Sequence, residues 1–171
     1  LLLVAVWAEV WHYGSHRAFH LKSLHWIHAE HHRSRLSSPF TALSFSFTEK
    51  LVFDLGMVGG MAIVGLFVDL NFYGIAAWFV GYLIINSYGH ANYEIRGEAF
   101  MRLKGSVLTT TVYHALHHSR YTGNYGLGTR ILDRLLGTEW PDSVAVYDRV
   151  VVQKAPLQAL RETVTHPEEK E

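Results

Sequence analysis

Histidine carries the chemistry that stands out in this sequence, which holds 12 His and no Cys among 171 residues. Neutral imidazole is a strong ligand for iron, zinc, copper and nickel ions. Eleven of the histidines lie in three places: the segment 12–32, the single residue His90 and the segment 114–118. The first segment contains HxxxH followed by HxxHH, and the last repeats HxxHH. Residues three and four apart share a helix face, so this spacing predicts imidazoles that converge on metal ions.

The number of candidate ligands predicts two metal ions. A zinc ion takes four ligands in a structural site and usually three protein ligands in a catalytic site, so eight or nine imidazoles are too many for one ion. A pH-responsive histidine cluster and a histidine-rich metal-handling tract are alternatives, but neither accounts for the repeated helical spacing. The predicted ligands are His16, His20, His28, His31, His32, His90, His114, His117 and His118, with His12 and His25 as additional candidates. His166 stands apart and is predicted to be a surface residue.

Two apolar segments, 51–68 and 72–88, are separated by three residues and predict an antiparallel helical hairpin. Each has about 17–18 residues, the lower limit for crossing a bilayer. The segment 1–11 is also apolar and is interpreted as the end of a membrane-spanning helix that begins upstream. The sequence therefore predicts an all-α fold, an integral-membrane helical bundle with a cytosolic histidine-rich helical cap. The alternative is a buried hairpin in a soluble all-α protein.

The charge distribution predicts an orientation and argues against one class of partner. Lys and Arg together number 15, as do Asp and Glu, so the formal net charge is zero and no nucleic-acid partner is expected. The basic residues of 12–50 and 89–134 flank the same end of the hairpin, which the positive-inside tendency places in the cytoplasm. We expect a membrane-embedded domain over residues 1–140, with its first spanning helices missing, and a cytosolic C-terminal tail over 141–171.

With these motifs the chain resembles the fatty acid hydroxylase/sterol desaturase superfamily of integral-membrane di-iron oxygenases. The three histidine motifs of that superfamily read HRAFH at 16–20, HAEHH at 28–32 and HALHH at 114–118. His90 matches an additional histidine between the second and third motifs. NYG at 124–126 and DRLLGT at 133–138 are similar to further stretches of the family. The resemblance extends from Tyr13 to Thr138, and the motifs, their order and the intervening hairpin agree together.

The resemblance implies iron, dioxygen and a lipid. Members of the superfamily hydroxylate or desaturate fatty acyl chains, sterols and related lipids, with two non-haem iron ions as cofactor and dioxygen as co-substrate. Their electrons come from a separate donor such as cytochrome b5 or a ferredoxin-type protein. By this resemblance we expect an integral-membrane enzyme that takes its lipid from the bilayer. Its active site should face the cytoplasm, in the endoplasmic reticulum of a eukaryote or the inner membrane of a bacterium.

Polar residues beside the ligands should orient each ring by accepting the N–H that faces away from the metal. Carboxylate and amide oxygens near the histidine motifs are candidates for this role. They are Glu94, Asn92, Asn124, Asp133 and Glu30.

Three other functions fit parts of the pattern. A carotenoid hydroxylase is also a small membrane protein with histidine motifs, but the NYG and DRLLGT stretches argue against it. A membrane zinc hydrolase needs a carboxylate base beside its metal, as in HExxH, which HAEHH does not supply. A non-enzymatic metal transporter should carry His or Asp within a span, and the segment 55–68 contains neither.

Overall fold

The computed structural model of the chain describes residues 2–34, 37–95, 107–159 and 161–164, and the regular structure within these ranges is helical. The β-type pairing described there is a single antiparallel bridge between Leu108 and Thr129. The all-α prediction is therefore confirmed, whereas the predicted surface residue His166 lies outside the described residues. The α-helices are α1 (Leu2–Phe19), α2 (His25–His28), α3 (Phe47–Gly65), α4 (Phe72–Gly89), α6 (Thr111–Arg120), α7 (Ile131–Leu135) and α8 (Ser143–Tyr147). The 3₁₀ helices η1 (His31–Arg33) and η2 (Pro39–Leu43) and the π-helix η3 (Asp148–Val152) complete the set.

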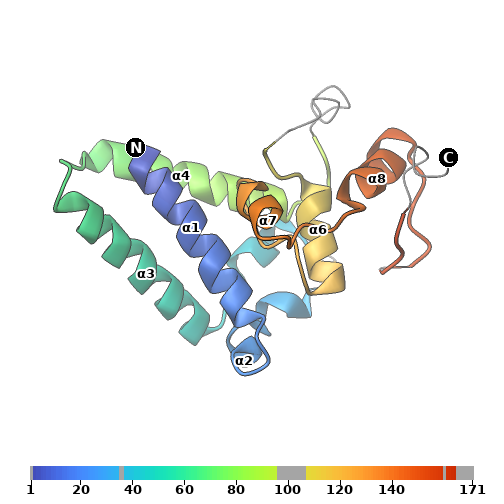
Figure 1. Cartoon of the computed structure of the whole chain (residues 1–171), viewed down its shortest axis with the longest axis horizontal. Helices are drawn as coiled ribbons and strands as arrows, with labels where there is room; N and C mark the ends of the chain where they lie inside the picture. The colour runs from blue at the N-terminus through green and yellow to red at the C-terminus, as the bar shows by residue number, and fades with distance from the viewer. Residues whose placement is uncertain (1, 35–36, 96–106, 160, 165–171) are drawn as a thin grey trace.

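Three long helices, α1, α3 and α4, form one half of the molecule, and the shorter helices lie toward its other half (Figure 1). Helices α3 and α4 make the predicted hairpin, and α1 lies against it. At the end of the hairpin away from its turn, α2 meets the C-terminal end of α1, and α6 packs on α4 (Figure 1). The long helices thus act as a frame that holds the histidine-bearing segments together.

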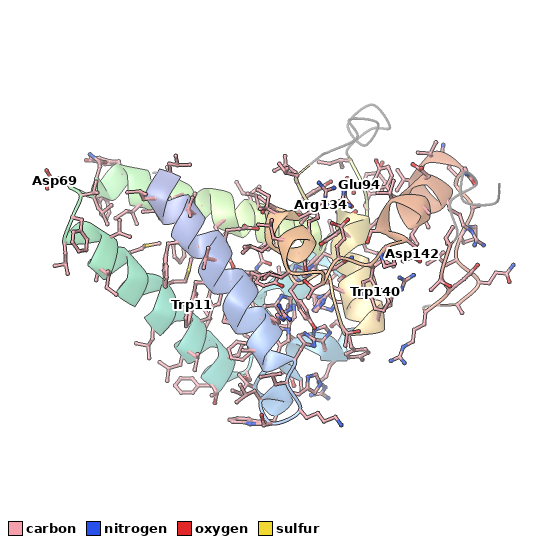
Figure 2. The ribbon with its side chains drawn as sticks, viewed as in Figure 1. Trp11, Asp69, Glu94, Arg134, Trp140 and Asp142 are labelled. Atoms are coloured by element: carbon pink, nitrogen blue, oxygen red, sulfur yellow. The ribbon has the colours of Figure 1, made fainter. Side chains whose placement is uncertain are left out.

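The contact between α1 and α3 is made by two tryptophans of α1 on two glycines of α3. A Cβ atom at Gly60 would lie 1.8 Å from Cε2 of Trp7, and one at Gly56 would lie 1.9 Å from Cζ2 of Trp11. The indole N–H of Trp11 donates to the carbonyl of Phe53 at 3.0 Å, between the two helices (Figure 2). Because these glycines have no side chains, the rings lie directly on the α3 backbone.

Polar side chains fix the start of the three helices that frame the histidines. Ser46 before α3, Asn71 before α4 and Thr110 before α6 each accept the backbone N–H three residues further on, all at 3.1 Å. Such N-caps satisfy backbone donors that have no partner within the helix. The cap at Ser46 begins α3 four residues before the apolar segment 51–68, so a polar turn precedes the apolar part of this helix.

Large apolar side chains cover the outside of the hairpin near its turn. Leu66, Phe67, Phe72 and Tyr73 are 75–83% exposed. Among the described residues, however, no helix combines the length and the apolarity that a membrane crossing requires. The segments predicted to span are thus present as helices, but an integral-membrane bundle is not shown. Polar residues stand at one end of each, at 48–50 in α3 and 86–87 in α4.

The packing of α1 against α3 can be tested at Gly60. We expect Gly60→Ala to destabilise the protein by about 1–3 kcal/mol, because the new methyl group overlaps the Trp7 ring and the packed core has no room for it. Gly59→Ala is the matched control: its Cβ meets no atom within 4 Å, so removing a helical glycine should stabilise by about 0.5–1 kcal/mol. Denaturant unfolding in detergent measures both. Equal stability changes in the two variants would contradict this packing.

Candidate metal centre

Nine histidines converge from four parts of the chain. The C-terminal end of α1, the segment α2–η1, the residue after α4, and α6 each contribute. Within the part of the chain that the structure describes, their nitrogens form two groups, in each of which the donor atoms lie within 4.8 Å of one another. The first group is His16, His20, His28, His32 and His117, and the second group is His31, His90, His114 and His118. The structure thus brings together the nine histidines that the sequence singles out and divides them between two sites.

The two HxxHH motifs contribute to both groups in the same way. Histidines four apart serve one group, as His28 and His32 do in the first and His114 and His118 in the second. The intervening histidine of each motif faces the other group. This follows from helix geometry, because consecutive residues diverge by about 100° around the axis. The sequence predicts three imidazoles on one face, but the adjacent pair of each motif is split between two sites.

Two rings of the second group face each other with bare nitrogens. Nδ1 of His90 donates to the carbonyl of Asn86 at 2.8 Å, and Nδ1 of His31 donates to the carbonyl of Ser44 at 3.1 Å. A carbonyl oxygen only accepts, so each Nδ1 carries the ring proton and each Nε2 presents a lone pair. These two Nε2 atoms nevertheless lie 3.1 Å apart. A cation bound to both nitrogens would turn this repulsion into attraction.

Two rings of the first group are oriented in the same way. Nδ1 of His16 donates to the carbonyl of Tyr125, and Nδ1 of His117 donates to the carbonyl of Gly123, both at 2.8 Å. Nε2 of His117 then lies 3.1 Å from Nε2 of His32. Backbone carbonyls on the far side of each ring therefore aim the Nε2 lone pairs inward, as they do for metal-bound histidine in general.

The spacing of the nitrogens suits metal ions. Nitrogens that bind one ion at about 2.1 Å and at right angles to one another lie about 3 Å apart. The Nε2 atoms of His90, His114 and His118 are separated by 2.9 and 3.2 Å. Nε2 of His16 and of His28 is buried without a hydrogen-bond partner among the described residues. The two groups could each hold a metal ion, and the orphaned nitrogens fit that role.

Burial keeps these imidazoles in the form that binds metal. Removal from water lowers the pKa of His90 to about 4 and that of His118 to about 3, because the charged ring is disfavoured in a buried site. Burial likewise lowers the pKa of His20 to about 2. The rings are neutral at pH 7, and a histidine must be neutral at its ligand nitrogen to bind a metal ion.

Glu49 supplies a carboxylate to the first group, and the sequence analysis missed it. Its Oε1 lies 2.5 Å from Nδ1 of His28, and both side chains are buried. The signal was present as Ser46-Phe-Thr-Glu49, a capping pattern in which the glutamate normally turns back to its own helix. Here Ser46 also donates to the carbonyl of Ile27 at 2.6 Å, which holds the start of α3 against α2. The glutamate therefore reaches the ring of His28.

Asp133 and Asn124 act through the loop that carries the NYG motif. Asp133 accepts the backbone N–H groups of Tyr125 at 2.9 Å and Gly126 at 2.7 Å. The carbonyl of Tyr125 in turn accepts from His16, so Asp133 positions a ligand through the loop. Asn124 has a positive φ of 53°, is fully buried, and donates to the carbonyl of Tyr113 at 3.1 Å. This bond ties the loop to α6.

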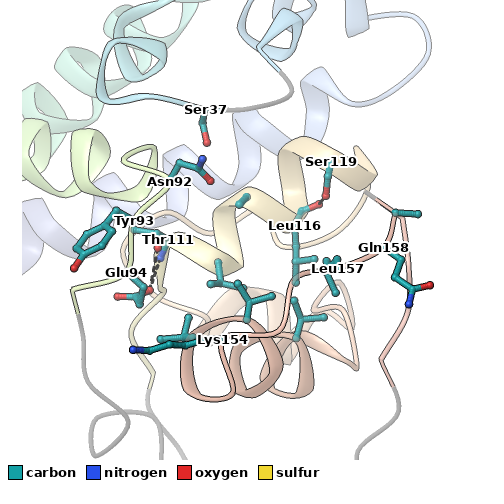
Figure 3. Close-up of a pocket in the computed structure, with 16 residues that line it drawn as sticks. Ser37, Asn92, Tyr93, Glu94, Thr111, Leu116, Ser119, Lys154, Leu157 and Gln158 are labelled. Carbon is teal, nitrogen blue, oxygen red and sulfur yellow. Dashed lines mark hydrogen bonds between the residues drawn. The ribbon is translucent and has the colours of Figure 1, made fainter.

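Glu94 and Asn92 lie on the other side of α6. They line a separate cavity of about 720 Å³, which none of the nine histidines lines (Figure 3). Glu94 accepts the backbone N–H and the hydroxyl of Thr111 at 2.9 and 3.1 Å, at the positive N-terminal end of α6. It thereby fixes the start of the helix that carries three ligands. Glu30 forms an exposed pair with Arg33 at 3.0 Å.

His12 and His25 lie beside the two groups but belong to neither. The ring of His12 stands edge-on to that of His16, with ring centres 5.2 Å apart. Its Nδ1 is hydrogen-bonded to the hydroxyl of Tyr82 at 3.0 Å. The ring of His25 lies 5.8 Å from that of His20, and its side chain is half-buried.

A small cavity of about 40 Å³ adjoins both groups. Two ligands of the first group and three of the second line it, together with Phe45, Phe53 and Tyr82. The phenyl rings restrict the water that can enter, while the space suffices for a small molecule beside the histidines. Reacting atoms placed here lie next to both sites.

Comparison with known proteins identifies the family. The model of the fatty acid hydroxylase family matches residues 1–138. The chain belongs to the fatty acid hydroxylase family. The relatives include very-long-chain aldehyde decarbonylase GL1-6 of Oryza sativa subsp. indica, 31% identical over 92% of this chain and 25% of the relative. The protein CER1-like 1 of Arabidopsis thaliana is 28% identical over 86% of this chain and 24% of the relative.

A third relative, very-long-chain aldehyde decarbonylase CER1 of Arabidopsis thaliana, is 24% identical over 84% of this chain and 24% of its own length. The chain therefore spans about a quarter of the length of these curated relatives. No solved structure matches it significantly. The family match covers all nine histidines of the two groups, Glu49 and the loop that Asp133 holds.

Removal of one ligand should weaken one site of this fatty acid hydroxylase family member. We expect His117→Ala to weaken metal binding at the first group, which keeps four of its five imidazoles, and to leave the second group unchanged, so that one of two bound ions is lost more readily during purification. His25→Ala, outside both groups, should keep the full content. Metal analysis of the purified, iron-loaded chain with a circular dichroism spectrum measures both. Full iron content in His117→Ala would remove this residue from the site.

The carboxylate of Glu49 should strengthen metal binding by orienting and polarising His28. We expect Glu49→Gln, which keeps an acceptor but cannot ionise when the metal binds, to weaken metal binding about 10–100-fold. Glu30→Gln is the control, because Glu30 pairs with Arg33 on the surface. Competition with a chelator gives both affinities. Equal affinities in wild type and Glu49→Gln would contradict the role assigned to Glu49.

Proposed function

We propose that the chain is the catalytic domain of a lipid-modifying oxidoreductase that holds two iron ions and consumes dioxygen. The observation that carries the proposal is the pair of buried imidazole groups, in each of which Nε2 atoms lie about 3 Å apart. Electrons come from a separate donor, such as a cytochrome b5 or a ferredoxin-type protein.

Iron held by these nitrogens would supply the redox chemistry that activates dioxygen, since imidazole suits iron and leaves positions open. The protein's own contribution is geometric. Backbone carbonyls aim His16, His31, His90 and His117 inward. Burial raises the pKa of Glu49 to about 8, and a metal ion on His28 would favour the charged form of Glu49, which would then balance part of the metal charge. The aromatic rings around the small cavity limit water at the reacting centre.

The substrate is a long-chain lipid. Membership of the fatty acid hydroxylase family supports hydroxylation or desaturation, as the sequence predicts. The names of the relatives favour a second reaction, because they describe very-long-chain aldehyde decarbonylases. Both reactions need a hydrocarbon chain placed beside the two metal groups, and the same site serves either.

The enzyme works at a membrane. Exposed apolar side chains at the hairpin turn, among them Phe67 and Phe72, form a surface that favours lipid over water. We place this surface in the bilayer and the histidine groups at its cytoplasmic face, where the predicted orientation puts the basic residues. The membrane is the endoplasmic reticulum in a eukaryote or the inner membrane in a bacterium.

Mass spectrometry of lipids tests the proposal and separates the two reactions. Cells that express the full-length gene should accumulate a lipid with one added oxygen atom or two fewer hydrogen atoms, or a hydrocarbon one carbon shorter than an aldehyde. His117→Ala should abolish this product, because it disrupts the first group, and His25→Ala should retain it. Purified protein that takes up stoichiometric zinc after iron-replete expression, with unchanged cellular lipids, would favour a zinc hydrolase instead.

A further inference from the structure

A long apolar groove lies on the surface between α1, α4 and the segment 127–132. Its volume is about 610 Å³, within the range of ligand pockets. Val6 and Val10 of α1 and Ile85 of α4 contribute exposed apolar surface. Of the described residues that line it, only Glu9 carries a charged group, and its carboxylate accepts the backbone N–H and the hydroxyl of Thr129, both at 2.8 Å. The groove therefore presents hydrocarbon surface to its occupant.

Tyr82 stands between this groove and the small cavity beside the histidines, because it lines both. The ring stacks on Trp78 on the groove side, with ring centres 5.2 Å apart. On the cavity side it stacks on Phe53 at 6.2 Å. Its hydroxyl is hydrogen-bonded to Nδ1 of His12 at 3.0 Å. A hydrocarbon chain in the groove would therefore have to pass Tyr82 to reach the metal groups.

His12 places a free polar atom at this passage. Its ring lines the cavity, and its Nε2 is buried without a hydrogen-bond partner among the described residues. Because the hydroxyl of Tyr82 can donate or accept, His12 can present either an N–H or a lone pair at Nε2. It can therefore bond to a carbonyl oxygen or to a hydroxyl group of a ligand.

The cavity beside the histidines has room for the end of a chain and no more. It measures about 40 Å³, and it shares no lining residue with the larger cavity behind α6. A hydrocarbon chain that reacted at its middle would need apolar space on both sides of the metal groups. The groove provides such space on one side, and the cavity behind α6 does not adjoin the small cavity through any shared residue.

We propose that the substrate binds end-on, with its hydrocarbon tail in the groove and its oxygen-bearing end past Tyr82, hydrogen-bonded to Nε2 of His12. This inference rests on the proposed function and deepens it, because it assigns the reaction to the terminal functional group of a long unbranched lipid. A fatty aldehyde or alcohol has this chemistry. His12 is then a positioning residue for the substrate, and Gly81 in the groove is a determinant of chain length.

Binding of redox-inert straight-chain alcohols tests the groove without turnover. On the iron-loaded full chain, affinity should rise about fourfold per methylene group from octanol until the groove is filled. Gly81→Leu places a bulky side chain at the groove, since Gly81 lines it and a Cβ there meets no atom within 4 Å. It should weaken octadecanol binding at least tenfold and change octanol binding less than twofold. Gly59→Leu, equally open but outside the groove, should match wild type.

A second pair of measurements tests the orientation of the chain. His12→Leu should remove the preference for octadecanol over octadecane and leave octadecane binding unchanged, with iron content intact. Ala77→Leu provides another variant that fills the groove should Gly81→Leu fail to fold. If the groove variants bind alcohols of every length as wild type does, the proposal is overturned. It is also overturned if His12→Leu weakens the binding of octadecanol and of octadecane equally. Both binding measurements are made without any conversion of lipid. A failure of the proposed function, which shows only in the lipid products, can therefore be distinguished from a failure of this inference.

Discussion

Lone pairs that face one another in a buried space are the constraint on which this structure depends. Residues from four parts of the chain bring neutral imidazoles to within about 3 Å at their Nε2 atoms. Without a cation the second group would hold repelling nitrogens in a site from which water is largely excluded. Metal binding would therefore contribute to the folding free energy of this half of the molecule and would join the segments between 16 and 118.

The rest of the fold holds these nitrogens in place. The long helices meet through ring-on-backbone contacts, so α1 cannot slide along α3 without losing the fit of Trp7 and Trp11 to two glycines. Asp133 and Asn124 brace the loop whose carbonyls turn His16 and His117. Buried polar residues in this half of the protein thus have a common purpose, which is to fix the ring orientation that lets each Nε2 reach a metal.

The sequence predicted the helical class, the hairpin and the nine converging histidines. These features depend on local spacing, because residues three or four apart lie on the same face of a helix. It did not predict how adjacent histidines divide between two sites, since that depends on where each helix axis lies. The contact between Glu49 and His28 was not predicted, because the two residues are 21 positions apart in the sequence. The capping pattern at Ser46 indicated a partner within the helix of Glu49 instead. Glu94, expected beside a ligand, holds the start of α6. The groove could not be predicted from the sequence either, because its lining residues, from Val6 to Leu132, are brought together only by tertiary packing.

Anomalous X-ray diffraction at the iron edge, on crystals of the iron-loaded chain, tests the central claim most directly. The account predicts two separate iron peaks, one enclosed by His16, His20, His28, His32 and His117 and the other by His31, His90, His114 and His118. A single peak, or rings that point away from any common centre, would contradict it.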